Sequence, residues 1–270
     1  MSFAPTVPAA HAAAPALPGP LWLNDPADAP ALLQHSGYAL LRPEALTQLA
    51  SAELPTLAAL SPCWNRLPPD AHLKDGGRYR HRRHGSFVQD LATGTVTAVP
   101  HRAHWQPTTY NALHGGMLRW FEPLEAALGQ APPFLTLVGS LGRLFAQAMV
   151  PPAAPAFDGR WYIEAHPFRI DTAAGVGRPT PEGAHRDGVA FVAVVLVNRV
   201  GVHGGETRVF QAEGPHGVRF TLTEPWSALL LDDTRVVHES TPIQPQTEGG
   251  HRDTLVITYR TDGFQDPPAS

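Results

Sequence analysis

The chain has 270 residues, and its 24 acidic and 20 basic side chains give a net charge of −4. This length can bury a core without disulfides or metal ions as staples. A slightly acidic chain has no general attraction to nucleic acid or to anionic membranes, so we expect neither as a partner. The one cysteine, Cys63, excludes an internal disulfide, and the N-terminus lacks the basic region of a signal peptide. We therefore expect a cytoplasmic protein.

The first 60 residues predict a tail followed by short elements. Residues 1–20 are rich in Ala and Pro and predict a disordered tail. Residues 28–35 predict a short helix, and GYALLRP after it predicts a strand that ends at a proline. Apolar spacing over residues 43–59 predicts a helix, or two short helices because Pro55 lies inside it.

A basic segment follows, in which Arg78, Arg80 and Arg82 alternate with tyrosine and histidine. One interpretation is a solvated basic strand. The other is the wall of a pocket that binds an anionic substrate, since arginine forks match carboxylates. The segment is too short for a nucleic-acid site in an acidic chain.

The middle of the chain predicts two helices and a strand. One helix is expected from about Met117, burying Leu118 and Phe121, and a packing helix is expected over residues 135–149. The strand is WYIEAHPFRI, which contains the polar residues His166 and Arg169.

His166 and Arg169 stand inside that strand, where neither residue type is stable without polar partners. They are either satisfied core groups or pocket-lining substrate contacts. From there on, about seven short strands with turns between them predict a sandwich or jelly roll. The expected fold class is mainly β with flanking α-helices, as one domain over residues 21–262 and a loose tail over residues 263–270.

The strongest chemical signal is His185-x-Asp187 at the start of an apolar run, with His238 after a later apolar strand. Residues two apart in a strand point to the same face, so both side chains can converge on one point. A lone HxD occurs often by chance, and this chain has 14 histidines. The order of the parts nevertheless favours two histidines and a carboxylate around Fe(II), an arrangement that leaves one face of the metal open.

Arg252 opens the final predicted strand, and Thr254 lies two residues further on the same face. A planar cation there suits the distal carboxylate of a 2-oxo acid. The alternative is a surface ion pair of Arg252 with Asp253 or Glu248.

Several segments together resemble the iron(II)/2-oxoglutarate-dependent dioxygenases, in particular the branch typified by bacterial L-isoleucine dioxygenase. They cover roughly residues 75–260 and read, in order, GRYRHRR, YNALHGGMLRWF, HPFR, AHRDGVAFV, GGET, VVHES and HRDTLVITY. The resemblance implies a double-stranded β-helix (jelly-roll, cupin-like) fold. It also implies that His185, Asp187 and His238 bind iron, and that Arg252, with Thr254 as a possible helper, binds 2-oxoglutarate.

The function implied by this resemblance is hydroxylation of an unactivated C–H bond in a free L-amino acid or close derivative. The cofactors are then Fe(II), 2-oxoglutarate and O₂, and the products include succinate and CO₂. Candidate substrate contacts are Arg78, Arg80, Arg82, His166 and Arg169. Desaturation or ring formation by the same chemistry stays open, as does a non-catalytic jelly-roll binding protein, which has no need of a buried Arg252.

Overall fold

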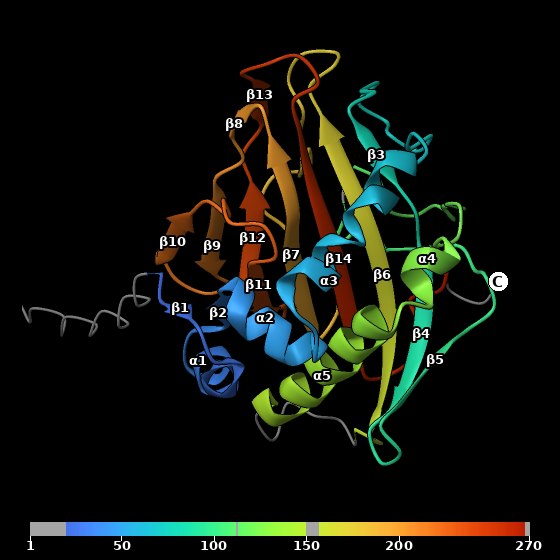
Figure 1. Ribbon diagram of the computed structural model, residues 1–270, viewed down its shortest axis with the longest axis vertical. Coiled ribbons are helices and arrows are strands. Elements are labelled where there is room, and N and C mark those ends of the chain that lie inside the picture. The colour runs from blue at the N-terminus through green and yellow to red at the C-terminus, as the bar shows by residue number, and fades with distance from the viewer. Residues whose placement is uncertain (1–19, 112, 150–156, 268–270) are drawn as a thin grey trace, which may run out of the picture.

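A large mixed sheet forms the centre of the protein (Figure 1). The structure, a computed structural model, describes residues 20–111, 113–149 and 157–267. Within these ranges the sheet has nine strands in the order β1-β2-β11-β7-β14-β6-β4-β5, and β3 also pairs with β6. Its members are β1 (Trp22–Leu23), β2 (Tyr38–Leu41), β3 (Arg80–Arg82), β4 (Gly85–Asp90), β5 (Thr95–Ala98), β6 (Arg160–Asp171), β7 (Phe191–Val200), β11 (Ala228–Asp232) and β14 (His251–Arg260).

Two small sheets complete the β structure of the described residues. One has the order β10-β9-β12, and the other pairs β13 with β8. Their strands are β8 (Val202–Gly204), β9 (Thr207–Gln211), β10 (Gly217–Phe220), β12 (Val236–Ser240) and β13 (Ile243–Pro245).

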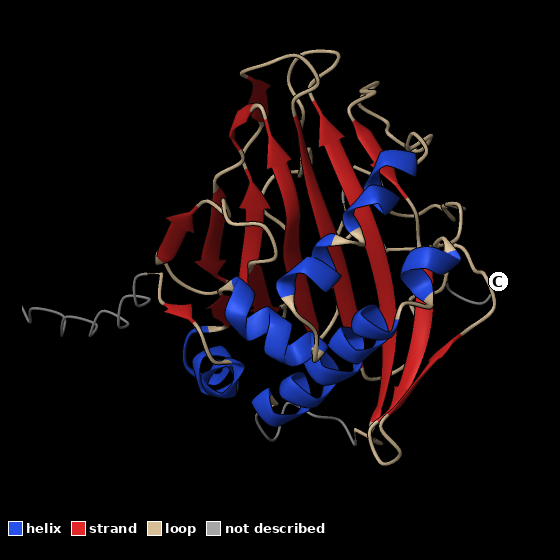
Figure 2. Cartoon of the chain, viewed as in Figure 1, coloured by secondary structure: helices blue, strands red, loops and turns tan. Residues whose placement is uncertain are grey.

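Helices gather on one face of the large sheet (Figure 2). The longest, α5 (Pro132–Ala148), packs against α1 and α2. The others are η1 (Pro26–Asp28), α1 (Ala29–Ser36), α2 (Pro43–Ala50), α3 (Leu54–Ala58), η2 (Ser61–Arg66) and α4 (Ala126–Gly129). No helix in the described ranges has the length and apolar character needed to cross a membrane.

Alternation along the two longest strands separates the core from a polar cavity. On β6, Trp161 and Ile163 pack into the core under the helices, whereas His166 and Phe168 point to the opposite face and line a cavity. On β14 the same alternation sends Leu255, Ile257 and Tyr259 to the core and Arg252, Thr254 and Val256 to the cavity. The antiparallel register places Thr254 beside Phe168 and Val256 beside His166. One face of this strand pair therefore stabilises the fold while the other carries chemistry.

The predicted fold class, mainly β with flanking helices, is confirmed. The predicted packing helix is α5, and the predicted helix pair over residues 43–59 is α2 and α3. The helix expected from Met117 is wrong: residues 117–121 are not helical, and Leu118 is 50% exposed. The backbone of this segment pairs with a distant segment and not within a helical turn. Arg119 and His104 exchange two backbone hydrogen bonds of 2.9 Å. The predicted tail lies, except for residue 20, outside the described residues.

Two glycines of α5 lie where the helix approaches the sheet, and they leave different amounts of room for a side chain. The Gln89 side-chain amide donates to the Gly139 carbonyl at 2.8 Å, and the Trp161 indole donates to the Gly142 carbonyl at 2.9 Å. A Cβ atom at Gly142 would overlap the Gln89 amide, whereas one at Gly139 would meet Val96 Cγ2 at 3.3 Å.

We predict that Gly142→Ala lowers the free energy of unfolding by about 1–3 kcal/mol, because overpacking outweighs the helix propensity gained. The matched variant Gly139→Ala should stay within about 1 kcal/mol of wild type, because a helix gains about that much from Ala over Gly. Denaturant unfolding of both variants measures this. Equal stability of the two variants would contradict the packing argument.

Candidate active site

Two histidines face each other across an isolated antiparallel bridge. His185 precedes β7 and His238 lies in β12, and their backbones exchange two hydrogen bonds of 3.1 and 3.0 Å. Their imidazole centroids are consequently 4.8 Å apart. The bridge brings together two residues separated by 53 positions in the sequence.

Asp187 completes a group of three potential metal ligands. Its Oδ1 lies 3.8 Å from His185 Nε2, and its Oδ2 lies 3.9 Å from His238 Nε2. One ligand atom from each residue lies within 4.8 Å of the others. His185 forms the isolated β-bridge, and Asp187 lies two residues further on in the non-strand segment, here called the Asp187 turn, that leads into β7. The side chains of both residues line the same cavity.

Asp233, at the end of β11, holds this turn in place. Its carboxylate accepts hydrogen bonds from the backbone N–H groups of Asp187 (3.0 Å), Gly188 (2.8 Å) and Val189 (3.1 Å). Gly188 has a φ of +73°, and a Cβ there would run into the Tyr110 ring. Burial, reinforced by the neighbouring Asp187 charge, raises the pKa of Asp233 to about 7.

The imidazoles are arranged to present nitrogen lone pairs. His185 Nδ1 bonds the Gly183 carbonyl at 2.9 Å, which places the proton on Nδ1 and leaves Nε2 free. Burial opposes the charge on His185, but Asp187 and Glu182 outweigh it and raise its pKa. Burial and the adjacent His185 lower the pKa of His238 to about 4, so this ring is neutral at pH 7. Two imidazoles and a carboxylate in this arrangement fit a divalent iron ion.

Arg252 is a buried cation with free hydrogen-bonding capacity. Its side chain lines the cavity, the residue is 4% exposed, and its Nε and Nη2 have no hydrogen-bond partner among the described residues. Burial and the nearby Arg199 lower its pKa to about 10. The alternative surface pair with Asp253 is wrong, because Asp253 points to the other face and binds Arg169 at 2.7 and 2.8 Å. An unpaired buried guanidinium fits the carboxylate of a bound ligand.

One cavity of about 130 Å³ contains all these groups. Its walls include the three potential ligands, Arg252 and Thr254, and also Arg80, Arg82 and His166 among the predicted substrate contacts. Two other predicted contacts lie elsewhere: Arg78 is exposed, and Arg169 is bound to Asp253.

A larger cavity of about 490 Å³ lies on the outer side of the Asp187 turn, bordered by Tyr110, Arg260 and Phe264. None of the three potential metal ligands lines it. The smaller cavity is therefore the candidate active site, since it holds the chemically competent groups.

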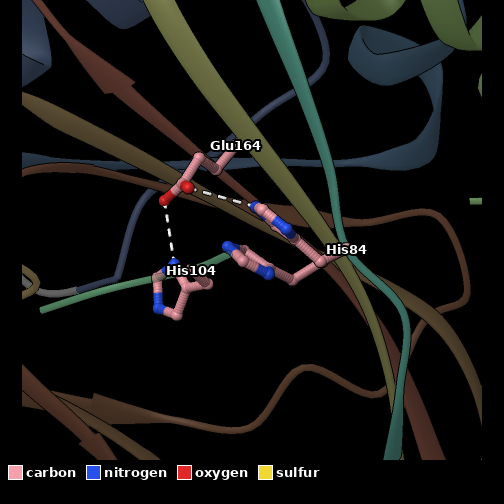
Figure 3. A group of neighbouring side chains, drawn as sticks. His84, His104 and Glu164 are labelled. Carbon is pink, nitrogen blue, oxygen red and sulfur yellow. Dashed lines mark hydrogen bonds and ion pairs between the residues drawn. The ribbon is translucent and has the colours of Figure 1, made fainter. Parts of the chain in front are cut away.

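A second group of potential ligands includes two residues of the cavity wall, His104 and His166. It consists of His84, His104, Glu164 and His166, all buried and with ligand atoms within 4.8 Å of one another. Figure 3 shows the Glu164 carboxylate between two imidazoles, bonded to His84 Nε2 at 3.1 Å and to His104 Nδ1 at 3.0 Å. Its composition resembles that of the first group.

The electrostatic surroundings of the second group differ, because guanidinium ions already surround it. Arg102 lies 3.7 Å from the Glu164 carboxylate, and Arg82 donates to His166 Nδ1 at 2.7 Å. Burial raises the pKa of Glu164, but hydrogen bonds and charge from His104 and His84 outweigh this and hold it well below the usual range. These positive charges disfavour a further divalent ion. We interpret the group as a buried polar network that fixes the cavity wall.

Sequence reasoning missed several residues of the site. Gln106 donates from Nε2 to Asp187 Oδ1 at 3.4 Å, and its Oε1 accepts from Arg119 at 2.8 Å. Arg119 belongs to the GGMLRWF segment, which resembles the family, but the helix expected there concealed its role. Asp233 follows the LLL strand, where a carboxylate after an apolar run could have been noticed. Glu164 gave no signal beyond its position two residues before His166.

Residues 61–258 of the chain match a family model described as 2OG-Fe dioxygenase. The crystal structure of a bsmA homolog from Methylobium petroleophilum PM1 has 57% sequence identity, a TM-score of 0.84, and a match over 92% of this chain and 98% of that one. No curated protein matches the sequence.

Two more distant structures share the fold. IDO from Bacillus thuringiensis has 16% identity and a TM-score of 0.68 over 87% of this chain and 95% of that one. The Fe(II)/(alpha)ketoglutarate-dependent dioxygenase TqaL has 20% identity and a TM-score of 0.64 over 86% and 84%. The predicted jelly-roll fold is the fold of these neighbours.

We predict that Asp233→Ala weakens Fe(II) binding and lowers the melting temperature, because three backbone N–H groups lose their acceptor. The loss of these bonds should cost about 1–3 kcal/mol or more. The matched control is Asp232→Ala, whose carboxylate binds Thr234 instead of the turn. Metal content after Fe(II) loading and thermal unfolding report both effects. Full Fe(II) binding by Asp233→Ala would show that the turn keeps its shape without this carboxylate.

Proposed function

Because the chain belongs to the 2OG-Fe dioxygenase family, we propose that it hydroxylates an unactivated C–H bond of a free L-amino acid or a close derivative. The family uses Fe(II), 2-oxoglutarate and O₂. The observation that carries the proposal is one cavity in which two imidazoles and a carboxylate lie beside a buried, unpaired guanidinium.

His185, Asp187 and His238 are the proposed iron ligands. Bound iron would supply the redox chemistry that couples oxidation of 2-oxoglutarate to succinate and CO₂ with oxidation of the substrate. The protein supplies position: the His185–His238 bridge fixes the two rings, and Asp233 fixes the carboxylate. Gln106 orients that carboxylate further by its hydrogen bond.

Arg252 is the proposed partner of the distal carboxylate of 2-oxoglutarate. Its two unpaired nitrogens offer a fork for two carboxylate oxygens. Thr254 lies on the same face of β14 and lines the same cavity, so its hydroxyl can donate a further bond.

The amino-acid assignment rests on the motifs that resemble the L-isoleucine dioxygenase branch and on the small cavity. The cavity is lined by cationic and apolar side chains, as a small carboxylate-bearing molecule requires. A substrate-stimulated succinate assay over the twenty amino acids, with mass analysis of the product, tests it. Gain of one oxygen atom supports hydroxylation, whereas loss of two hydrogens indicates desaturation or ring closure. Absence of succinate formation with Fe(II), 2-oxoglutarate and O₂ would contradict the proposal and favour the alternative of a non-catalytic binding protein.

We predict that His185→Ala and His238→Ala fold but lose bound iron and all succinate formation. Asp187→Glu should also fail, because one added methylene exceeds the tolerance of such a site, about 0.5 Å. Circular dichroism and metal analysis separate loss of iron from loss of fold. Wild-type iron content and turnover in His185→Ala would place the iron elsewhere.

Arg252→Ala should bind iron normally yet require far more 2-oxoglutarate. Removing one partner of a buried ion pair costs about 3–5 kcal/mol, and each 1.4 kcal/mol is about tenfold in affinity. The loss is then roughly a hundredfold to a few thousandfold. Arg252→Lys should be intermediate, since it keeps the charge and loses the fork. Anaerobic titration of 2-oxoglutarate into the Fe(II) protein, followed by absorbance, measures the affinity, and wild-type affinity in Arg252→Ala would refute the assignment.

A further inference from the structure

Two cavity arginines remain without an anionic partner after the roles above are assigned. Arg80 forms an ion pair with Asp70 at 2.7 Å. Among the described residues, neither Arg82 nor Arg119 has a carboxylate in ion-pair contact, and the Nε of each lacks a hydrogen-bond partner. Both side chains line the cavity. Buried charges without partners are costly, so a fold that keeps two of them together has room for a ligand anion.

The two guanidinium groups share one aromatic neighbour. The Arg82 guanidinium carbon lies 3.9 Å from the Phe121 ring centroid, and that of Arg119 lies 6.0 Å from the same centroid. Arg119 is 2% exposed, and burial together with Arg80 lowers its pKa to about 10. Arg252 belongs to a different part of the cavity wall. It lies on β14 and pairs with Ile170 of β6, and Arg80 of β3 pairs with Ile170 from the other side. The cavity therefore has two cationic regions.

A carboxylate with one free oxygen lines the same cavity beside a proposed iron ligand. Glu182 lines the cavity, its Oε2 is buried without a hydrogen-bond partner, and its Oε1 lies 3.6 Å from His185 Nε2. The negative charge of Glu182 also acts electrostatically on the Arg119 guanidinium. A ligand held by Arg119 thus meets an acceptor for a cation on the side toward His185.

We propose that Arg82 and Arg119 bind the carboxylate of the substrate and that Glu182 binds its ammonium group. This assignment rests on the proposed function and deepens it, since it identifies the substrate as a zwitterionic α-amino acid and assigns its two charged ends. Arg119 also binds Gln106, which binds Asp187, so the subsite lies two hydrogen bonds from an iron ligand. Phe168, Val194 and Val256 leave an apolar wall for the side chain of the amino acid.

The first arm of the test uses ligand analogues. The probes are the twenty L-amino acids and, for the most active of them, the decarboxylated amine, the carboxamide and the deaminated acid. Each is assayed for stimulation of succinate release above the substrate-free rate. The parent amino acid should stimulate release, whereas the three analogues, each lacking one charge, should need about a hundredfold higher concentration or more, as expected for an unpaired buried charge.

The second arm uses variants. Arg119→Gln and Arg82→Gln should each raise the substrate KM about a hundredfold or more and change the 2-oxoglutarate KM far less. Arg119→Lys should be intermediate. Glu182→Gln should accept the deaminated acid as well as the parent when both are compared on iron-loaded protein. The control Arg143→Gln removes an exposed arginine on α5, bonded to Ser140, and should match wild type throughout.

Gln106→Leu separates a binding role of Arg119 from an indirect one. If Arg119 acts only by orienting Gln106, both variants will weaken iron binding and neither will change the substrate KM, which would overturn the proposal. An amine or carboxamide as active as its parent acid would overturn it too, as would an iron-loaded Glu182→Gln protein that still rejects the deaminated acid. Substrate-free succinate formation with no response to any probe would refute this subsite and leave the proposed iron chemistry standing, whereas absence of succinate altogether would refute the latter.

Discussion

The backbone bridge between His185 and His238 is the constraint on which the site depends. Two hydrogen bonds of 3.1 and 3.0 Å tie the turn before β7 to β12, in a separate small sheet. Without that bridge the two imidazoles would belong to independent segments, and ordering them on a metal would cost conformational entropy. With it, the centroids of the two rings lie 4.8 Å apart. Asp187 needs its own restraint, which the carboxylate of Asp233 provides through three backbone N–H groups.

Two groups of similar composition contribute to the wall of one cavity, and their surroundings give them different roles. Among the described residues, the group around His185 has Glu182 beside it and no guanidinium in ion-pair contact, so a divalent cation lowers its electrostatic energy. The group around Glu164 has Arg102 and Arg82 in contact, and its carboxylate already accepts two imidazole N–H bonds. Histidine and carboxylate content alone does not define a metal site, because the net charge around the ligands decides which ion is stable there.

Much of the fold could be predicted from sequence, because period-two alternation along β6 and β14 and the apolar spacing of α5 are local signals. The His185, Asp187 and His238 group could be proposed for the same reason, since each residue adjoins an apolar run. The restraint on Asp187 could not, because the carboxylate that holds its backbone, Asp233, lies 46 residues away. Likewise, Arg119 sits in a segment whose apolar residues suggested a helix, and only its pairing with His104 brings it into the cavity. Arg169 lies one residue out of phase with the cavity-facing residues of β6, where it binds Asp253 instead of lining the cavity.

We propose that iron occupies the His185 group and not the Glu164 group. The most direct measurement is anomalous X-ray scattering at the iron absorption edge, from crystals equilibrated anaerobically with Fe(II) and 2-oxoglutarate. We expect one anomalous peak per chain, between His185, Asp187 and His238, with 2-oxoglutarate density running from it toward Arg252. A peak among His84, His104, Glu164 and His166, whether alone or as a second one, would contradict the argument that guanidinium charge excludes a metal there.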